Sequence, residues 1–418
     1  MAQPIRLLLA SFVGSGVLFT SALLSLPVMP VAQVQAQTLD AAFQEGGKKY
    51  QAGDYAGAIK AYDRAIEINP KLAVAYLNRG IAKWSLNNYS GAEQDFDTVL
   101  KLDSKNTAAL LGRGGAKLVR QQYAAAATNF EAALKLDPKQ TNALLGLAEA
   151  KAGQGNFQGA LTDLNRALDL KQSAGLYLRR GQIKAQFEDI EGAIADYDQA
   201  LKLAPRDPAA HMALGDARFA QGDLQGARAN YGEAIRLDPK RVSAHIARGT
   251  AQLSLGEEEA ALEDFNAALA LDRNNPTALF RRGLTQAALK NSEQAIADYN
   301  QAIDLGPETA SLYFYRGNEK LIGQGDLQGA ILDYDQALRL DPKYGQAYLY
   351  RASAKSKLGD LAGTLADLRQ AKQFLEQSGN TALAQRAQAD LDRMQGRSPS
   401  TTTNQPEASP EPTLTPNP

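Results

Sequence analysis

Residues 53–70 read GDYAGAIKAYDRAIEINP, and the same order of residue types returns at 222–239 (GDLQGARANYGEAIRLDP) and 325–342 (GDLQGAILDYDQALRLDP). Each stretch begins with a Gly-Asp turn signal, continues with small and bulky residues at helical spacing, and ends in proline. The prolines that end repeats lie about 34 residues apart, or multiples of that number: Pro70, Pro138, Pro205, Pro239, Pro307 and Pro342. A fixed period of this length indicates a repeat array in which each repeat holds two helices and a turn.

Small residues recur at two places in each repeat, where two helices have to approach each other closely. The first small residue lies in the first helix: Gly46, Gly80, Gly114, Ala148, Gly181, Gly215, Gly249, Gly283, Gly317 and Ala352. The second lies twelve residues later and is followed, four residues on, by a bulky side chain such as Tyr62, Phe96, Phe130, Tyr197, Tyr231, Phe265 or Tyr299. We interpret these residues as the holes and knobs of packed helix pairs, and no stretch predicts a strand.

Because several positions recur together, the pattern is specific, and the chain resembles the tetratricopeptide repeat family. The resemblance covers residues 39–376 as ten repeats and implies an all-α, right-handed superhelical solenoid of helix-turn-helix repeats. Glycines are expected to end the first helix of several repeats: Gly53, Gly155, Gly222, Gly325 and Gly359. One residue is inserted near Gly323, and the register is expected to soften there.

The two ends of the array have their own composition. Residues 377–396 are expected to form a C-terminal capping helix, because their apolar residues fall on one helical face and the other face is polar. Residues 397–418 are rich in Pro, Ser and Thr and have almost no apolar side chains, so we expect a disordered tail.

The first 36 residues differ from the rest of the chain. Arg6 is the only charge before an apolar stretch at residues 7–28, and Val34-Gln35-Ala36 resembles a signal-peptidase site before Gln37. A cleaved signal peptide is the preferred interpretation. An uncleaved N-terminal anchor is the alternative, because the apolar run approaches the ~20 residues that span a bilayer. Both interpretations place the array beyond a membrane, in a periplasm, a lumen or the extracellular space, and in an exported protein of bacterial, cyanobacterial-like type.

Composition excludes several classes of function. The chain has 45 Lys and Arg against 46 Asp and Glu, so no net positive field favours nucleic acid, and a membrane contact is expected only through the N-terminal segment. The absence of cysteine excludes disulfides and thiolate metal sites. No group of catalytic residues stands apart from the repeat pattern, so we predict neither enzyme activity, nor a cofactor, nor a metal.

Two sets of polar residues recur within the repeat and have a structural interpretation. Arg precedes the first small residue in seven repeats, in step with an Asp or Asn before the bulky residue, which predicts ion pairs between helices. His211 and His245 occupy the same place in successive repeats, roughly 8 to 10 Å apart, too far to share one metal ion. Packing is therefore the preferred role of the histidines, with a pH sensor as the alternative.

The resemblance implies that the first helices form a concave wall that binds peptides. The predicted wall is apolar rather than charged, and the Lys and Asn pattern that similar domains use to clamp a terminal carboxylate is absent except for Asn78. We expect about half of the apolar wall residues to pack between helices. The candidate anchors are Phe43, Tyr50, Leu77, Asn78 and Trp84 at one end, and Phe280, Phe314, Asn318 and Tyr350 at the other.

The sequence thus favours an extracytoplasmic scaffold that holds protein segments in its groove, in the assembly or secretion of a protein complex. The alternative is a membrane-tethered structural spacer that has no dedicated groove ligand. Protein or peptide segments are the expected partners in the first case.

Overall fold

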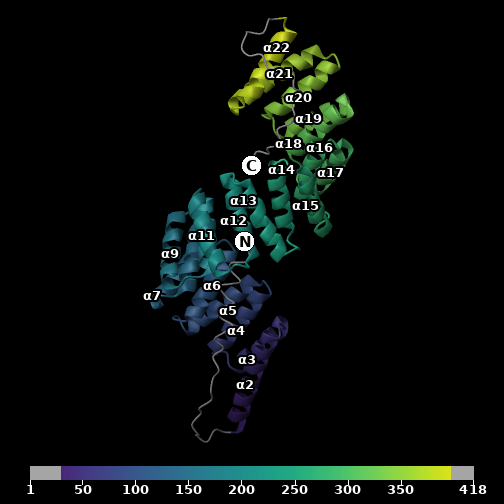
Figure 1. Ribbon diagram of the computed structural model, residues 1–418. Coiled ribbons are helices and arrows are strands. Elements are labelled where there is room, and N and C mark those ends of the chain that lie inside the picture. Colours follow the sequence, from purple (N-terminus) through teal and green to yellow (C-terminus); the bar gives the residue numbers. More distant parts are fainter. Residues whose placement is uncertain (1–29, 397–418) are drawn as a thin grey trace. The chain divides into compact units, whose positions relative to one another are not determined.

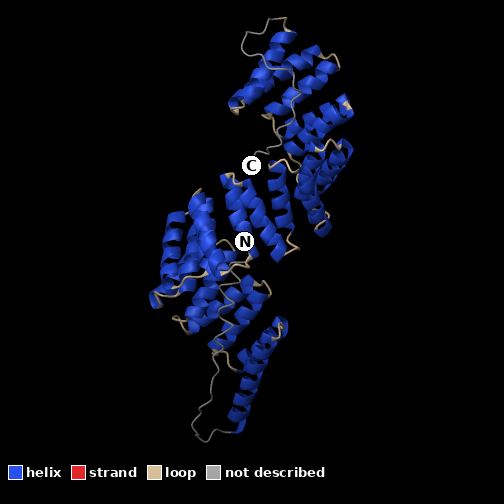
Figure 2. Ribbon diagram, in the orientation of Figure 1, coloured by secondary structure: helices blue, strands red, loops and turns tan. Residues whose placement is uncertain are grey.

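A computed structural model describes residues 30–396 of the chain, and this part contains helices and no strand (Figure 2). The predicted export segment at residues 7–28 and the predicted tail at 397–418 lie outside the described residues. Within the described part, no helix combines the length and the apolar character that a membrane crossing requires.

The helices divide into two compact groups, each described by itself (Figure 1). We call the group that ends at Pro205 the N-terminal stack. It contains α2 (Pro30–Gln51), α3 (Tyr55–Ile68), α4 (Ala73–Ser85), α5 (Tyr89–Leu102), α6 (Thr107–Val119), α7 (Tyr123–Leu136), α8 (Thr141–Gly153), α9 (Phe157–Leu170), α10 (Ala174–Gln186) and α11 (Ile190–Leu203).

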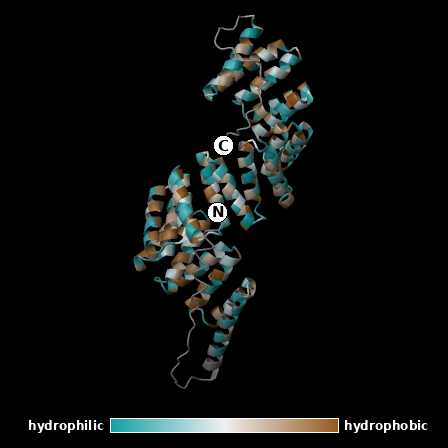
Figure 3. Ribbon diagram, in the orientation of Figure 1, coloured by the Kyte–Doolittle hydropathy of each residue, from teal (hydrophilic) through white to brown (hydrophobic). Residues whose placement is uncertain are grey.

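The C-terminal stack begins at Arg206. It contains α12 (Pro208–Gln221), α13 (Leu224–Leu237), α14 (Val242–Ser254), α15 (Glu258–Leu271), α16 (Pro276–Ala288), α17 (Ser292–Leu305), α18 (Ala310–Asn318), η1 (Glu319–Gln324), α19 (Leu327–Leu340), α20 (Gly345–Lys357), α21 (Leu361–Gln377) and α22 (Thr381–Met394). Apolar and polar residues share the same helices in both stacks (Figure 3), as expected when each helix buries one face.

Consecutive helices form the pairs that the sequence predicts, from α2 with α3 to α20 with α21. The first small residue of each repeat lies against the bulky side chain of the second helix. A Cβ on Gly80 would lie 2.9 Å from the Phe96 ring, and a Cβ on Gly215 would lie 2.5 Å from the Tyr231 ring. The predicted hole-and-knob contact is confirmed, and the smallness of these residues sets how closely the paired helices approach.

The turn inside each repeat requires one residue in the left-handed region. The predicted glycines Gly53, Gly155, Gly222, Gly325 and Gly359 adopt φ between 71° and 86°, and four other repeats use Asn87, Gln121, Glu188 and Lys290 at φ 59° to 62°. The residue after the turn often caps the second helix. Asp54 accepts a hydrogen bond from the backbone N–H of Gly57, and Asp326 accepts one from Gly329, so the start of the helix is fixed by its own sequence.

The inserted residue near Gly323 is absorbed by a π-helix, η1, at the end of the first helix. A wider turn takes up one extra residue and leaves the second helix of the repeat in place. Arg316 and Asp333 are therefore 17 residues apart rather than the 16 of Arg282 and Asp298, and still form the same ion pair at 2.5 Å. The expectation that the register softens here was wrong, because the extra residue stays within η1.

The two ends of the described part differ from the helix pairs between them: α2 is longer than the other first helices, and α22 follows the last pair. The predicted cleavage point before Gln37 lies inside α2, which begins at Pro30. At the other end, α22 packs against α21 and buries Ala384, Ala387 and Leu391. These buried residues recur at helical spacing, so the apolar stripe of α22 covers the last helix pair.

Candidate functional site

The first helices form one layer of each stack. They contact one another in series, as in α2 with α4, α4 with α6, α12 with α14 and α14 with α16. Every substantial helix contact within residues 30–396 joins elements that are at most two places apart in the chain. No described helix therefore lies across the face of the first-helix layer that points away from the second helices, which we call the inner face.

Two positions of each first helix define what we call the inner row: the residue two before the first small residue and the residue directly after it. Two residues correspond to about 200° of helix, so the earlier position points away from the paired second helix. It covers the aromatic ring of the preceding repeat instead. A Cβ on Gly112 would lie 2.7 Å from the Phe96 ring, and the side chain of Asn78 forms a hydrogen bond with Tyr62.

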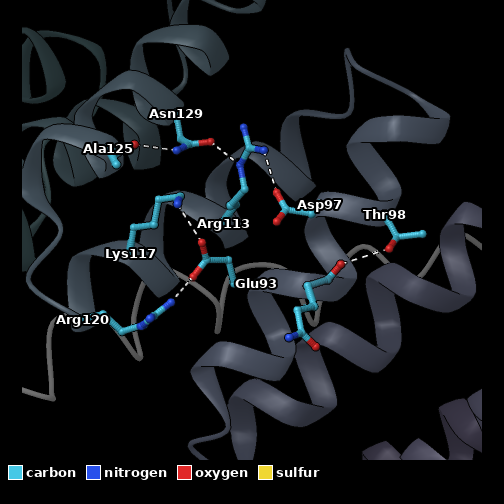
Figure 4. A network of polar contacts seen from close by, with 9 residues as sticks. Glu93, Asp97, Thr98, Arg113, Lys117, Arg120, Ala125 and Asn129 are labelled. Atoms are coloured by element: carbon cyan, nitrogen blue, oxygen red, sulfur yellow. Dashed lines mark hydrogen bonds and ion pairs between the residues drawn. The ribbon is translucent and has the colours of Figure 1, made fainter.

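The arginines beside the inner row form a structural ladder, as predicted. Arg79 donates to Asp95 of its own repeat at 2.5 Å and to Asp63 of the preceding repeat at 2.6 Å. Arg113 repeats this arrangement with Asn129 and Asp97 (Figure 4). The same bridging occurs for Arg180, Arg282, Arg316 and Arg351. These arginines are held between helices and are committed to joining repeats.

His245 is packed and paired in the way the sequence favours. Its Nδ1 lies 3.2 Å from Asp264 and its Nε2 lies 3.1 Å from the carbonyl oxygen of Pro239. Both ring nitrogens are thereby engaged inside the stack. In residues 30–396, no cluster of three His, Asp or Glu side chains is arranged to hold a metal ion.

The anchors predicted in the N-terminal stack separate into two groups. Phe43, Tyr50 and Asn78 surround Tyr62: the rings of Phe43 and Tyr62 lie 5.7 Å apart, Tyr50 interacts with Tyr62 electrostatically, and Asn78 hydrogen-bonds it. These three side chains are half-buried.

The remaining two, Leu77 and Trp84, belong to a hydrophobic core cluster that joins their own repeat to those that follow. Leu77 is half-buried, whereas Trp84 is only 7% exposed and packs against Tyr89 at 5.0 Å. The indole offers a partner little surface, so Trp84 is better described as core than as an anchor.

The anchors predicted in the C-terminal stack are more deeply buried. Phe314 is 3% exposed, Asn318 2% and Tyr350 9%, and only Phe280 is half-buried. The structure does bring them together: the rings of Phe314 and Tyr350 lie 5.5 Å apart in an edge-to-face contact, which is favourable for aromatic pairs. Phe314 therefore stabilises the stack, and its surface is not available to a ligand.

Sequence reasoning missed the charged part of the inner row. The charged residues are Arg179 and Glu149 in the N-terminal stack and Arg281 and Arg386 in the C-terminal stack, and none of them is among the predicted wall residues. Arg179 and Arg281 directly follow predicted wall residues, Glu149 directly follows the first small residue of its helix, and Arg386 lies on the capping helix. A comparison across repeats of the residue two before the first small residue would have found Arg179 and Arg281. It could not have shown which of the two arginines forms an ion pair.

The charged residues of the N-terminal stack neutralise each other. Glu149 follows the first small residue of α8, and Arg179 lies two residues before that of α10, and the two side chains form a close ion pair across adjacent first helices. Burial raises the pKa of the Glu149 carboxyl, and the Arg179 guanidinium opposes that rise. This part of the inner face carries no free charge.

The amino-acid sequence matches the family model described as "Tetratricopeptide repeat" at residues 77–127, 116–175, 178–242, 219–277 and 246–310, and the model described as "TPR repeat" at 46–87. Together these matches cover more than half of the chain. The chain belongs to the tetratricopeptide repeat family. Beyond residue 310, the helix pairs α18–α19 and α20–α21 continue the tetratricopeptide architecture.

Several solved structures are similar to this chain. Yeast Tom70 shares 15% identity over 85% of this chain and 96% of that chain, with a TM-score of 0.42. A tetratricopeptide repeat protein from Parabacteroides merdae shares 20% identity over 56% of this chain and 93% of that chain, with a TM-score of 0.46. A chain of the APC/C hetero-tetramer Cut9–Hcn1 shares 16% identity over 85% and 76% of the respective chains, with a TM-score of 0.48. A comparison with curated proteins found no significant match.

Tetratricopeptide repeats are protein-protein interaction modules, and proteins built from them are generally non-catalytic scaffolds. This chain is accordingly an interaction scaffold whose partners are proteins or peptides.

Proposed function

We propose that this scaffold works outside the cytoplasm and holds segments of other proteins on its inner face while a complex is assembled or secreted. The observation that carries the proposal is the uncovered layer of first helices, since every substantial helix contact in residues 30–396 joins elements at most two places apart in the chain. An inner face that the protein's own described helices leave open is available to another polypeptide. The proposed role is non-catalytic.

The proposed location rests on residues 1–36, where one arginine precedes a long apolar stretch and a small-residue cleavage signal. Removal of this segment would release a scaffold, whereas its retention would give the tethered spacer that we consider as the alternative. Fractionation of cells and sequencing of the amino terminus of the recovered protein distinguish the two. A terminus at Gln37 supports the released scaffold, and a retained Met1 in the membrane fraction supports the spacer.

Use of the inner face is tested by site-specific photo-crosslinking in cells. A photoreactive phenylalanine analogue replaces Phe280, which is half-buried on a first helix. The matched control places the same analogue at Leu332, which is 66% exposed on the second helix α19. The proposal expects discrete cross-linked products from position 280 and none from position 332. Equal products from both positions, or none from either, would contradict it.

A further inference from the structure

Three consecutive first helices of the C-terminal stack and the capping helix α22 carry an arginine or a tyrosine six residues after the N-cap, which is the earlier inner-row position of the first helices: Arg281 on α16, Tyr315 on α18, Tyr350 on α20 and Arg386 on α22. The four side chains interact in order along the row. Tyr315 interacts electrostatically with both Arg281 and Tyr350, and Tyr350 interacts in the same way with Arg386. The row is therefore continuous across these helices, with a cation at each end.

Neither arginine is neutralised within the described residues. Arg281 forms no ion pair in residues 30–396, and burial lowers the pKa of its guanidinium. Nη1 of Arg386 is buried and has no hydrogen-bond partner in the same part of the chain. A partly buried guanidinium without a carboxylate is costly, because the protein does not replace the hydration that the charge has lost.

A further unused donor lies in this row. Asn318, directly after the first small residue of α18, is 2% exposed and accepts a hydrogen bond from the Tyr334 hydroxyl at 2.8 Å. Its Nδ2 has no partner among the helices that the structure describes. Buried amide donors are usually satisfied, so the unsatisfied Nδ2 of Asn318 indicates that an acceptor is missing in this part of the row.

Repeat equivalence shows why these arginines lack a partner. In the N-terminal stack, the carboxylate that neutralises Arg179 comes from the later inner-row position of the preceding first helix, Glu149. The equivalent residue is Thr250 for Arg281 and Ser353 for Arg386. A hydroxyl thus replaces the carboxylate in both places. Of the other carboxylates in this part of the stack, Asp298 and Asp333 are paired with the ladder arginines Arg282 and Arg316, and Glu319 lies near the rings of Tyr299 and Tyr334.

We propose that the inner row of the C-terminal stack binds an extended, acidic segment of another protein, with one carboxylate on Arg281 and a second on Arg386. The proposal rests on the scaffold function above and names the chemistry of its partner. Three helix spacings separate the two arginines, roughly 27 Å, which an extended chain crosses in about eight residues. Between them, the half-buried Tyr315 and Phe280 offer a hydroxyl and ring surface for the middle of the segment.

The test measures binding of a fluorescein-labelled peptide to the full-length chain by fluorescence anisotropy. The peptide carries Glu at its first and ninth positions with Ser, Gly and Leu between them, and a second peptide carries Gln at both positions. We expect the Glu peptide to bind at least about tenfold more tightly than the Gln peptide, since a carboxylate adds charge-assisted hydrogen bonds to each arginine. Equal affinity of the two peptides would overturn the proposal.

Three variants locate the site. Arg281→Gln and Arg386→Gln should each weaken binding of the Glu peptide by about tenfold. Thr250→Glu leaves both arginines in place and supplies the carboxylate that Glu149 supplies to Arg179, so it should weaken binding to the same extent as Arg281→Gln. The matched control is Arg236→Gln, whose side chain is 63% exposed on the second helix α13, and it should leave the affinity unchanged. Thermal unfolding of each variant establishes that it is folded.

Two further outcomes separate this proposal from the scaffold function. Specific photo-crosslinks at position 280, together with no preference for the Glu peptide, would overturn the acidic partner and leave the scaffold function standing. The second outcome concerns the chain's own glutamates Glu407 and Glu411. If the Glu peptide binds only after both are changed to Gln, residues 397–418 would be the occupant of the row, and the proposal would be overturned.

Discussion

The tripeptide Arg-Arg-Gly stands on a first helix of each stack, at residues 179–181 and 281–283, and the two copies meet different surroundings. The second arginine does the same work in both, since Arg180 pairs with Asp196 and Arg282 pairs with Asp298. The first arginine differs: Arg179 is neutralised by Glu149, whereas Arg281 has no ion pair in residues 30–396. The ladder arginines Arg180 and Arg282 hold the helices together in both stacks. The residues before them, Arg179 and Arg281, determine whether the inner face carries a net charge there.

The largest expected effect compares the ladder in the two stacks. Arg282→Ala leaves the buried Asp298 without its guanidinium and should cost about 3 to 4 kcal/mol of stability. Arg180→Ala should cost less, because Asp196 keeps its ion pair with Lys184 at 2.8 Å. Hydrogen exchange of the affected helices, read by mass spectrometry, measures the loss locally in each stack. Arg282→Ala should destabilise the protein more than it weakens any partner, and a stable variant with lost binding would contradict the structural role.

The next effect should occur in one stack only. Glu149→Ala leaves Arg179 buried beside Gln182 alone, and we expect a loss of about 2 kcal/mol in the N-terminal stack. Arg281→Met in the C-terminal stack removes a cation that has no carboxylate, so its stability should stay within about 0.5 kcal/mol or rise. Hydrogen exchange of α10 and α16 provides the comparison. Equal losses in both variants would mean that the two arginines are not in different environments.

A smaller effect is expected from the π-helix, which occurs beside the row in the C-terminal stack. Deleting Ile322, which is 60% exposed in η1, should let the helix continue as an ordinary α-helix and restore the 16-residue spacing of the other ladder pairs. We expect stability to stay within about 1 kcal/mol of the parent protein. The melting temperature checks this, and a loss of several kcal/mol would show that η1 has a packing role of its own.

The smallest effect should be alike in both stacks, because the turns are alike. Gln121→Gly and Lys290→Gly place glycine where φ is 59° and 62°, and each should raise stability by about 0.5 to 1 kcal/mol. Chemical denaturation with matched Gln122→Gly and Asn291→Gly controls, one residue later at negative φ, isolates the conformational cause. A gain from the controls as large as from the variants would exclude that explanation.

The fold was predictable from the sequence because its determinants are local. Gly80 and Phe96, Gly53 in its turn, and Arg282 with Asp298 each lie within one repeat, at spacings that recur. The site was predictable only in part. Phe314 and Phe280 occupy equivalent positions, yet one is core and the other is half-buried, because the neighbouring repeats supply different side chains. For the same reason Arg179 and Arg281 cannot be told apart by their local sequence. They are distinguished by the residue on the preceding first helix, which is Glu149 for Arg179 and Thr250 for Arg281.

Each ladder arginine that bridges two repeats affects how such a protein can gain repeats in evolution. Arg351 contacts Asp367 in its own repeat and Asp335 in the repeat before it, so one side chain serves both a repeat and its junction. A duplicated helix pair would bring its own connector and would also present a carboxylate to the next pair in the array. Tandem copies can therefore be added or lost without compensating substitutions in the neighbours, which leaves selection free to act on the ligand-facing residues.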